Sequence, residues 1–481
     1  MAFSLAGLVF CSGLCFSSAF LSSRRYRNPV PLFPSVDEHW FDQKLDHFNG
    51  AESRVWKQRF FINDTFYDGG PVFLMIGGEG PANPAWMVSG TWLRYAEKLK
   101  ALCLLLEHRF YGKSHPTEDM RTANLQYLSS KQALADLAHF QTVMTQKLKL
   151  SHSKWVAFGG SYPGSLATWY RLKYPHLIYA AVATSAPVYA LINFTEYLEV
   201  VQTSLADYNS ECPKAVKSAS DTLVMMLKKK ENYVKITEDF KLCEILQINS
   251  EMDSAYFLET LAGNFMDVVQ YNNDNRAFEG VKGTNITIQV LCEIMADVSL
   301  GTPYDRYAAV AHLMMDALEM KCMDTSYKKY VQEMTSATWE GPAAVGGRQW
   351  VYQTCTEFGF FQSTDSTNQP FSGFSLSYFV QQCTDIYGPE FNFTRIVNAV
   401  GQTNEMYGGF NIQSSRIVFS NGCVDPWHAL GIIKDLSEEL PAVYIKGTAH
   451  CANMYPARAD DPPQLAAARL YILSLLEKWI N

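Results

Sequence analysis

The sequence has no excess of positive charge and no long apolar run beyond its first 20 residues. Its 40 Lys and Arg residues are outnumbered by 48 Asp and Glu residues, which gives a net charge of -8. The one basic run, Lys228-Lys229-Lys230, is typical of a solvated helix face, so we expect no nucleic-acid partner. Because no later run has the length of a transmembrane helix, we expect no spanning segment after the N-terminal stretch.

The N-terminal residues 1–22 are typical of a secretory signal peptide, although the usual positive charge before the apolar stretch is missing. A membrane anchor is the alternative, but the stretch is barely long enough to span a bilayer and Ser12, Ser17 and Ser18 dilute it. Candidate glycosylation sequons lie at Asn63, Asn193, Asn285 and Asn392. Together these features predict a glycoprotein of the secretory pathway with no membrane anchor.

The cysteines form no C-x-x-C pair and have no His/Cys spacing typical of zinc, so we expect neither a metal nor a cofactor. Of the 11 cysteines, Cys11 and Cys15 lie in the signal segment. The remaining cysteines are odd in number, and disulfides are their expected use in an oxidising compartment. Cys103 lies in an apolar strand-like run and is our candidate for the free thiol.

The apolar pattern predicts a parallel sheet covered by helices on both faces. Short apolar runs alternate with helical stretches over residues 35–190, and strand-like runs return over residues 406–481. Between them, residues 191–405 have a helical pattern and are rich in methionine, which we interpret as core filler. The 481 residues therefore predict one α/β domain, in two parts, interrupted by a mainly helical insertion.

The segment Gly159-Gly160-Ser161-Tyr162-Pro163-Gly164 is the strongest candidate for chemistry. It follows the apolar run 155–158 and precedes a helix-like run, and a serine between glycines at such a junction is typical of a hydrolase nucleophile. An ordinary glycine-rich loop is the alternative, since Pro163 replaces the last glycine of the G-x-S-x-G pattern. Proline there removes only an N–H that is unpaired in the first turn of a helix.

A serine nucleophile needs a base and an acid that orients the base, and in α/β-hydrolases the chain order is Ser, then Asp or Glu, then His. Asp425 and His450 each follow a strand-like run in that order, which predicts the triad Ser161, Asp425 and His450. His428 is the competing base, but no strand separates it from Asp425. His108 ends an earlier strand, where an ion-pair or loop-anchoring role suits it better.

Cysteines flank both the predicted acid and the predicted base. If the two catalytic loops adjoin, Cys423 and Cys451 are expected to form a disulfide that pins them together. Among the six cysteines of the insertion and its borders, Cys355–Cys383 is the most local pairing, and the other pairings stay open. For the oxyanion hole, the N–H of Tyr162 is one donor, and the glycine loop 77–80, represented by Gly78, is the candidate for the second.

Taken together, these motifs resemble the lysosomal prolyl carboxypeptidase and dipeptidyl peptidase II family of serine peptidases. The motifs, in family order, are residues 40–48, Gly77–Gly80, 107–112, the Ser161 turn, 420–427 and His450. The resemblance, from about residue 37 to the end, implies an α/β-hydrolase domain with a helical cap. It also implies exopeptidase-like cleavage of peptides, often after proline, in endosomes or lysosomes. By motif, Ser161 is the nucleophile, Asp425 the orienting acid and His450 the base.

The substrate pocket departs from that family's pattern. Proline-cleaving relatives place a methionine four residues after the nucleophile and a tryptophan four residues after the histidine, where this chain has Ser165 and Met454. Trp427, which follows the Asp-Pro pair, is kept. The resemblance therefore leaves open whether this chain prefers proline, because changes of this size in a pocket shift discrimination by only ~1–3 kcal/mol.

Two other functions remain as alternatives to a peptidase. An esterase or lipase of the same fold would use the same triad, and a catalytically silent relative would only bind peptides. The sequence also leaves open which end of a peptide is trimmed, and the oligomeric state, a homodimer included.

Overall fold

The computed structural model describes residues 36–274 and 276–481, so the predicted signal peptide lies outside the described residues. Its main element is an eight-stranded sheet with the order β1-β2-β4-β3-β5-β6-β9-β10. The strands are β1 (His39–Lys44), β2 (Val55–Asn63), β3 (Val72–Ile76), β4 (Leu102–Leu106), β5 (Trp155–Gly160), β6 (Ala180–Thr184), β9 (Ile417–Gly422) and β10 (Ala442–Ile445).

From β4 to β10 all neighbouring strands are parallel, whereas β1, β2 and β4 pair antiparallel. The parallel core was predicted from the apolar runs, and the antiparallel edge of β1 and β2 was not. The core strands carry apolar residues on both faces because helices cover both faces. In β3, Val72, Leu74 and Ile76 belong to one core cluster, and Phe73 and Met75 belong to another.

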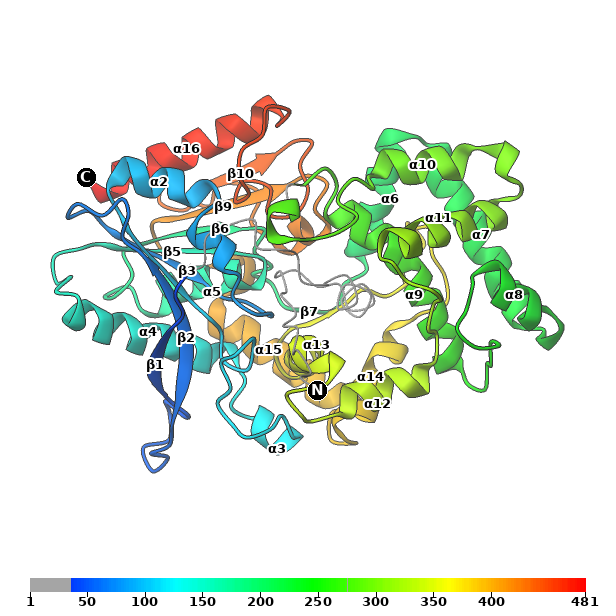
Figure 1. Cartoon of the computed structure of the whole chain (residues 1–481), viewed down its shortest axis with the longest axis horizontal. Helices are drawn as coiled ribbons and strands as arrows, with labels where there is room; N and C mark the ends of the chain where they lie inside the picture. Colours follow the sequence, from blue (N-terminus) through cyan, green and yellow to red (C-terminus); the bar gives the residue numbers. More distant parts are fainter. Residues whose placement is uncertain (1–35, 275) are drawn as a thin grey trace, which may run out of the picture.

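Helices pack on both faces of the sheet, as Figure 1 shows for α2 and α16 on one face and α4 on the other. The helices of this part are α2 (Thr91–Leu99), α3 (Thr122–Leu125), α4 (Ser130–Lys147), α5 (Tyr162–Lys173) and α16 (Pro463–Ile480). The short helices η1 (Pro84–Met87), η7 (Gly409–Asn411) and η8 (Pro426–Leu430) lie in its loops. This arrangement, with a sharp turn from β5 into α5, is an α/β-hydrolase fold.

The chain between β6 and β9 is mainly helical and, in the described residues, adds no strand to the large sheet. Figure 1 shows most of its helices, in green to yellow, to one side of the sheet. Its longer helices are α6 (Glu196–Tyr208), α7 (Glu211–Leu227), α9 (Glu251–Gln270), α11 (Pro303–Ala317), α14 (Leu376–Tyr387) and α15 (Phe393–Tyr407). Shorter helices are α8 (Tyr233–Asp239), α10 (Ile288–Ala296), α12 (Tyr327–Thr335), α13 (Gly347–Gln353), η2 (Lys230–Asn232), η3 (Arg276–Glu279), η4 (Val298–Leu300), η5 (Pro342–Val345) and η6 (Thr354–Phe358). A small parallel pair, β7 (Leu191–Asn193) and β8 (Gly359–Phe361), stands apart from the large sheet. We refer to residues 191–405 as the cap.

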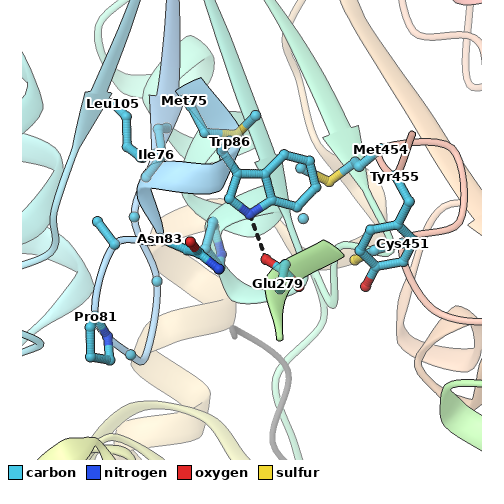
Figure 2. A pocket seen from close by; sticks show the side chains of 16 residues that line it. Met75, Ile76, Pro81, Asn83, Trp86, Leu105, Glu279, Cys451, Met454 and Tyr455 are labelled. Carbon is cyan, nitrogen blue, oxygen red and sulfur yellow. Dashed lines mark hydrogen bonds between the residues drawn. The ribbon is translucent and has the colours of Figure 1, made fainter. Parts of the chain in front are cut away.

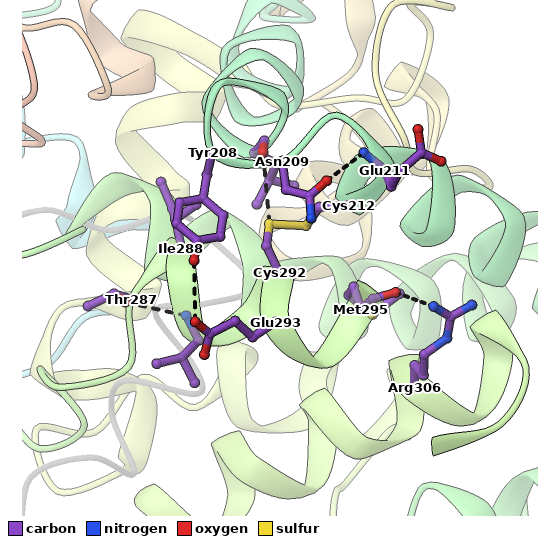
Figure 3. Close-up of a disulfide and its surroundings, with 12 residues drawn as sticks. Tyr208, Asn209, Glu211, Cys212, Thr287, Ile288, Cys292, Glu293, Met295 and Arg306 are labelled. Carbon is purple, nitrogen blue, oxygen red and sulfur yellow. Dashed lines mark hydrogen bonds between the residues drawn. A yellow bond between two sulfur atoms is a disulfide. The ribbon is translucent and has the colours of Figure 1, made fainter. Parts of the chain in front are cut away.

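Three disulfides hold the cap together. Cys212–Cys292 joins α7 to α10 (Figure 3), Cys243–Cys322 joins two loops, and Cys355–Cys383 joins η6 to α14. The last pairing is the one predicted from its short separation of 28 residues. Cys103 is a buried free thiol in β4, as expected.

The predicted Cys423–Cys451 disulfide is wrong, because both cysteines are free. The Cys423 sulfur, at the end of β9, accepts a hydrogen bond from the Gly447 N–H at 3.1 Å. Cys451 is instead buried beside Gly160, where a Cβ atom would lie 2.8 Å from its sulfur. The two loops do adjoin, but the two thiols face different neighbours.

Candidate active site

Ser161 lies at the sharp turn between β5 and α5. Its backbone has φ +64° and ψ -135°, a left-handed conformation that a residue with a side chain rarely adopts. Its N–H donates to the Thr184 carbonyl at the end of β6, at 2.9 Å. Backbone strain of this kind is typical of functional sites, and here it places the serine at the carboxyl edge of the sheet.

Two glycines let the chain make this turn. A Cβ atom on Gly159 would lie 2.1 Å from the Pro163 carbonyl oxygen, and one on Gly164 would lie 2.7 Å from the Thr184 carbonyl oxygen. The close contact with β6 therefore falls on Gly164, one position after Pro163. Gly164 thus takes the place of the last glycine of the G-x-S-x-G pattern. Pro163 occupies the first turn of α5, where a backbone N–H has no partner within the helix, so the lack of one costs nothing.

Asp425 and His450 meet at the ends of β9 and β10. Nδ1 of His450 lies 2.9 Å from Oδ1 of Asp425, and both side chains are fully buried. Among the described residues, Nε2 of His450 makes no hydrogen bond, and Nδ1 meets Asp425 as a close charge pair rather than in hydrogen-bond geometry. Burial by itself lowers the pKa of His450, but the carboxylate of Asp425 and the adjacent Cys451 outweigh it and raise that pKa well above its ordinary value.

The competing base takes a different position. The His428 ring contacts the backbone carbonyl of Asp425 at 2.7 Å rather than its carboxylate, and it packs against Tyr444 at the surface. The carboxylate of Asp425 is thus paired with His450.

Ser161 and His450 are brought together through their chain neighbours. Gly160 directly precedes Ser161, and Cys451 directly follows His450, and these two residues are in contact. The Cys451 N–H also donates to the Ser185 hydroxyl at 2.9 Å, next to the β6 residue that holds Ser161. The predicted nucleophile and base therefore lie on adjoining loops.

The glycine loop after β3 lies beside both. A small cavity of about 50 Å³ is lined by Gly78, by Gly160 and Pro163 of the serine turn, and by Cys451 and Met454 of the histidine loop. Figure 2 shows Trp86 and Glu279 among the side chains that line this cavity, joined by a hydrogen bond of 2.7 Å from the indole to the carboxylate. Gly78 thus lines the same cavity as the serine turn, and its N–H stays the candidate for the second oxyanion donor.

Glu79, in the same loop, carries a buried carboxyl group whose Oε2 has no hydrogen-bond partner. Burial raises its pKa to about 7, against the opposing effects of its own backbone N–H and of His450. The sequence predicted only the glycines of this loop, because nothing in a single sequence indicates that a glutamate among them is buried.

The residues expected to form the substrate pocket do not share one environment. Trp427 is buried and packs against Phe194, Tyr197 and Phe360. Ser165 is also buried, and its hydroxyl donates to the Pro187 carbonyl at 2.9 Å. Met454 lines the small cavity described above.

The cap contacts the loops around the site. Its Gln353 side chain bonds to the hydroxyl groups of Tyr162 and Tyr111, at 3.0 and 2.7 Å. His108 also contacts the Tyr162 hydroxyl at 3.0 Å, a contact that suits the loop-anchoring role expected for it. Within the described residues there is no group of three or more His, Cys, Asp or Glu side chains that could hold a metal ion, and no helix suited to cross a membrane.

Comparisons with known proteins agree with this geometry. The chain matches the family model described as serine carboxypeptidase S28 over residues 43–472. It is 40% identical over 462 residues to the "Putative serine protease K12H4.7" of Caenorhabditis elegans, a match that covers 93% of this chain and 89% of that protein.

Two further relatives carry more specific names. The thymus-specific serine protease of Mus musculus is 36% identical, with 92% of this chain and 87% of that protein covered. The lysosomal Pro-X carboxypeptidase of Bos taurus is 27% identical, with 98% of this chain and 92% of that protein covered. The chain therefore belongs to the serine carboxypeptidase S28 family and is a serine peptidase with an α/β-hydrolase fold.

Proposed function

We propose that Ser161, Asp425 and His450 form the catalytic triad of an exopeptidase that trims peptides in the endosomal and lysosomal pathway. The observation that carries the proposal is the buried pair of Asp425 and His450, beside a serine held in a left-handed turn. The name of the lysosomal Pro-X carboxypeptidase supports the compartment and the exopeptidase mode for this chain.

In this mechanism, His450 Nε2 accepts the proton of Ser161 Oγ as the oxygen attacks the scissile carbonyl, and then donates it to the leaving amine. Asp425 holds the imidazole by Nδ1 and stabilises the imidazolium that forms. The N–H groups of Tyr162 and Gly78 stabilise the oxyanion, and water then hydrolyses the acyl-enzyme.

The predicted glycosylation sites differ in exposure. Asn285 and Asn392 are exposed, whereas Asn63 and Asn193 are half-buried. The side-chain amide of Asn63 donates to the Met87 carbonyl at 2.6 Å, and that of Asn193 donates to Asp365 at 3.1 Å. We therefore place glycans at Asn285 and Asn392 first, which fits passage through the secretory pathway.

A peptide library tests the proposal. Purified protein is incubated with peptides that have free or blocked ends and with proline or another residue at each terminal position, and the products are identified by mass spectrometry. We expect stepwise loss from one free end, and no products from the Ser161→Ala variant. Internal cleavage alone would contradict the exopeptidase mode, and products from Ser161→Ala would contradict the nucleophile.

The same library distinguishes the two alternatives. Long-chain esters are included with the peptides, because a triad does not by itself choose an amide over an ester. Turnover of esters without any peptide product would indicate an esterase. Binding of peptides without turnover of either class would indicate a silent relative.

A further inference from the structure

The last residue of the cap helix α9, Gln270, contacts both loops that carry the proposed acid and base. Its side chain is completely buried. The His450 N–H donates to the Gln270 backbone carbonyl at 2.9 Å. The Trp427 indole N–H donates to the Gln270 side-chain oxygen, also at 2.9 Å.

These hydrogen bonds, together with the close charge pair of Asp425 and His450, form a ring through the proposed acid and base. Trp427 donates its backbone N–H to Oδ1 of Asp425 at 3.0 Å, and the same oxygen lies 2.9 Å from Nδ1 of His450. The ring therefore runs from the side chain of Gln270 through Trp427, Asp425 and His450 and returns to the backbone of Gln270. Only Gln270 in this ring belongs to the cap.

Neighbouring cap residues hold Gln270 in place. The Tyr197 hydroxyl of α6 donates to the same side-chain oxygen of Gln270 at 2.7 Å. The next residue, Tyr271, packs its ring edge-on against His450, with ring centres 5.8 Å apart. The guanidinium of Arg276 stacks on the Tyr271 ring, 3.3 Å from the ring centre. The end of α9 is thus fixed by contacts on several sides.

We propose that Gln270 is a positioning residue, through which the cap sets the geometry of the Asp425–His450 pair. The proposal rests on the proposed function, because it assumes that this pair is the acid and base of catalysis. A reactive geometry tolerates little displacement, and a shift of about 1 Å at a catalytic group can cost about 100-fold in rate. Loss of the Gln270 contacts should therefore lower kcat far more than it changes KM. Trp427 is a candidate pocket residue, but its packing against three other aromatic rings should keep it in place when the bond to Gln270 is lost.

Three variants test this inference. Gln270→Met keeps the length of the side chain but removes the oxygen that accepts from Trp427 and Tyr197. Gln270→Glu keeps an acceptor at that position and is the conservative rescue. Gln382→Met is the matched control, since Gln382 is another buried cap glutamine whose side-chain oxygen accepts from a tyrosine, Tyr330, at 3.0 Å.

We expect Gln270→Met to lower kcat about 10- to 100-fold with KM changed less than about 3-fold. We expect Gln270→Glu to recover most of that loss, and Gln382→Met to retain the kcat of the unchanged protein. Wild-type kcat in Gln270→Met would overturn the inference, as would equal losses of kcat in Gln270→Met and Gln382→Met.

The His450→Ala variant separates this inference from the proposed function. If His450→Ala is inactive while Gln270→Met has full activity, the triad stands and the positioning role of Gln270 fails. If His450→Ala retains full activity, His450 is not the base, and the proposed triad is wrong.

Discussion

At the scale of single residues, the site combines a strained serine with a buried ion pair. Ser161 has a left-handed backbone, and His450 lies 2.9 Å from Asp425. The chain order of these three residues could be predicted from the sequence, because strand-like runs precede each of them. The burial of Glu79 and Gln270 could not, since burial of a polar side chain depends on contacts between segments far apart in the chain.

The buried carboxyl of Glu79 should affect how kcat/KM depends on pH. As the proposed base, His450 must be neutral to accept a proton, so kcat/KM should rise with pH through the raised pKa of His450. The attraction between the charges of Glu79 and His450 lowers the pKa of Glu79. The same attraction raises the pKa of His450 when Glu79 is ionised. Glu79→Gln removes this charge, and the acidic limb of the kcat/KM profile should move to lower pH. A limb that stays in place or moves to higher pH would contradict this coupling.

At the scale of elements, the turn between β5 and α5 explains why the serine pattern tolerates Pro163. Gly159 and Gly164 make the close backbone contacts, and proline is suited to the first turn of the helix. The sequence indicated the strand, the turn and the helix correctly. It could not indicate that Gly164 packs against β6, because that contact depends on the spacing of two strands and a helix.

Adding a methyl group at this turn should be costly. In Gly159→Ala the new Cβ would meet the Pro163 carbonyl oxygen at 2.1 Å, so the backbone must shift. We expect the free energy of unfolding to fall by about 1–3 kcal/mol, measured by urea denaturation, with loss of activity. Gly401→Ala is the control, because Gly401 is exposed in α15 and nothing lies within 4 Å of its Cβ position. Gly401→Ala should raise the free energy of unfolding by about 0.5–1 kcal/mol. An equal fall in the free energy of unfolding in both variants would contradict a clash specific to Gly159.

At the scale of the whole molecule, loops at one edge of the sheet carry the proposed nucleophile, acid and base, and the cap contacts these loops. The division into a sheet domain and a helical insertion follows from hydrophobic periodicity, which is a local property of the chain. The pairing of cysteines is not local. Cys423 and Cys451 lie on adjoining loops, yet their sulfur atoms face Gly447 and Gly160. Strand pairing is not local either, so the sequence did not predict the antiparallel edge formed by β1 and β2.

The thiols and disulfides of the whole chain can be mapped in one experiment. The unreduced protein is denatured and alkylated, and its peptides are then sequenced by mass spectrometry. Within residues 36–481, we expect alkylated Cys103, Cys423 and Cys451 and the three cap disulfides, since only these three thiols are free. A peptide that joins Cys423 to Cys451 would contradict the arrangement of the two loops that carry Asp425 and His450.

The reaction of the protein with a fluorophosphonate tests the central claim most directly, because this reagent labels an activated serine. The labelled protein is digested, and the modified residue is identified by mass spectrometry, with Ser161→Ala treated in parallel. The proposed triad predicts one label per chain, on the oxygen of Ser161, and none on a folded Ser161→Ala variant. A label on another residue, or undiminished labelling of Ser161→Ala, would contradict Ser161 as the nucleophile.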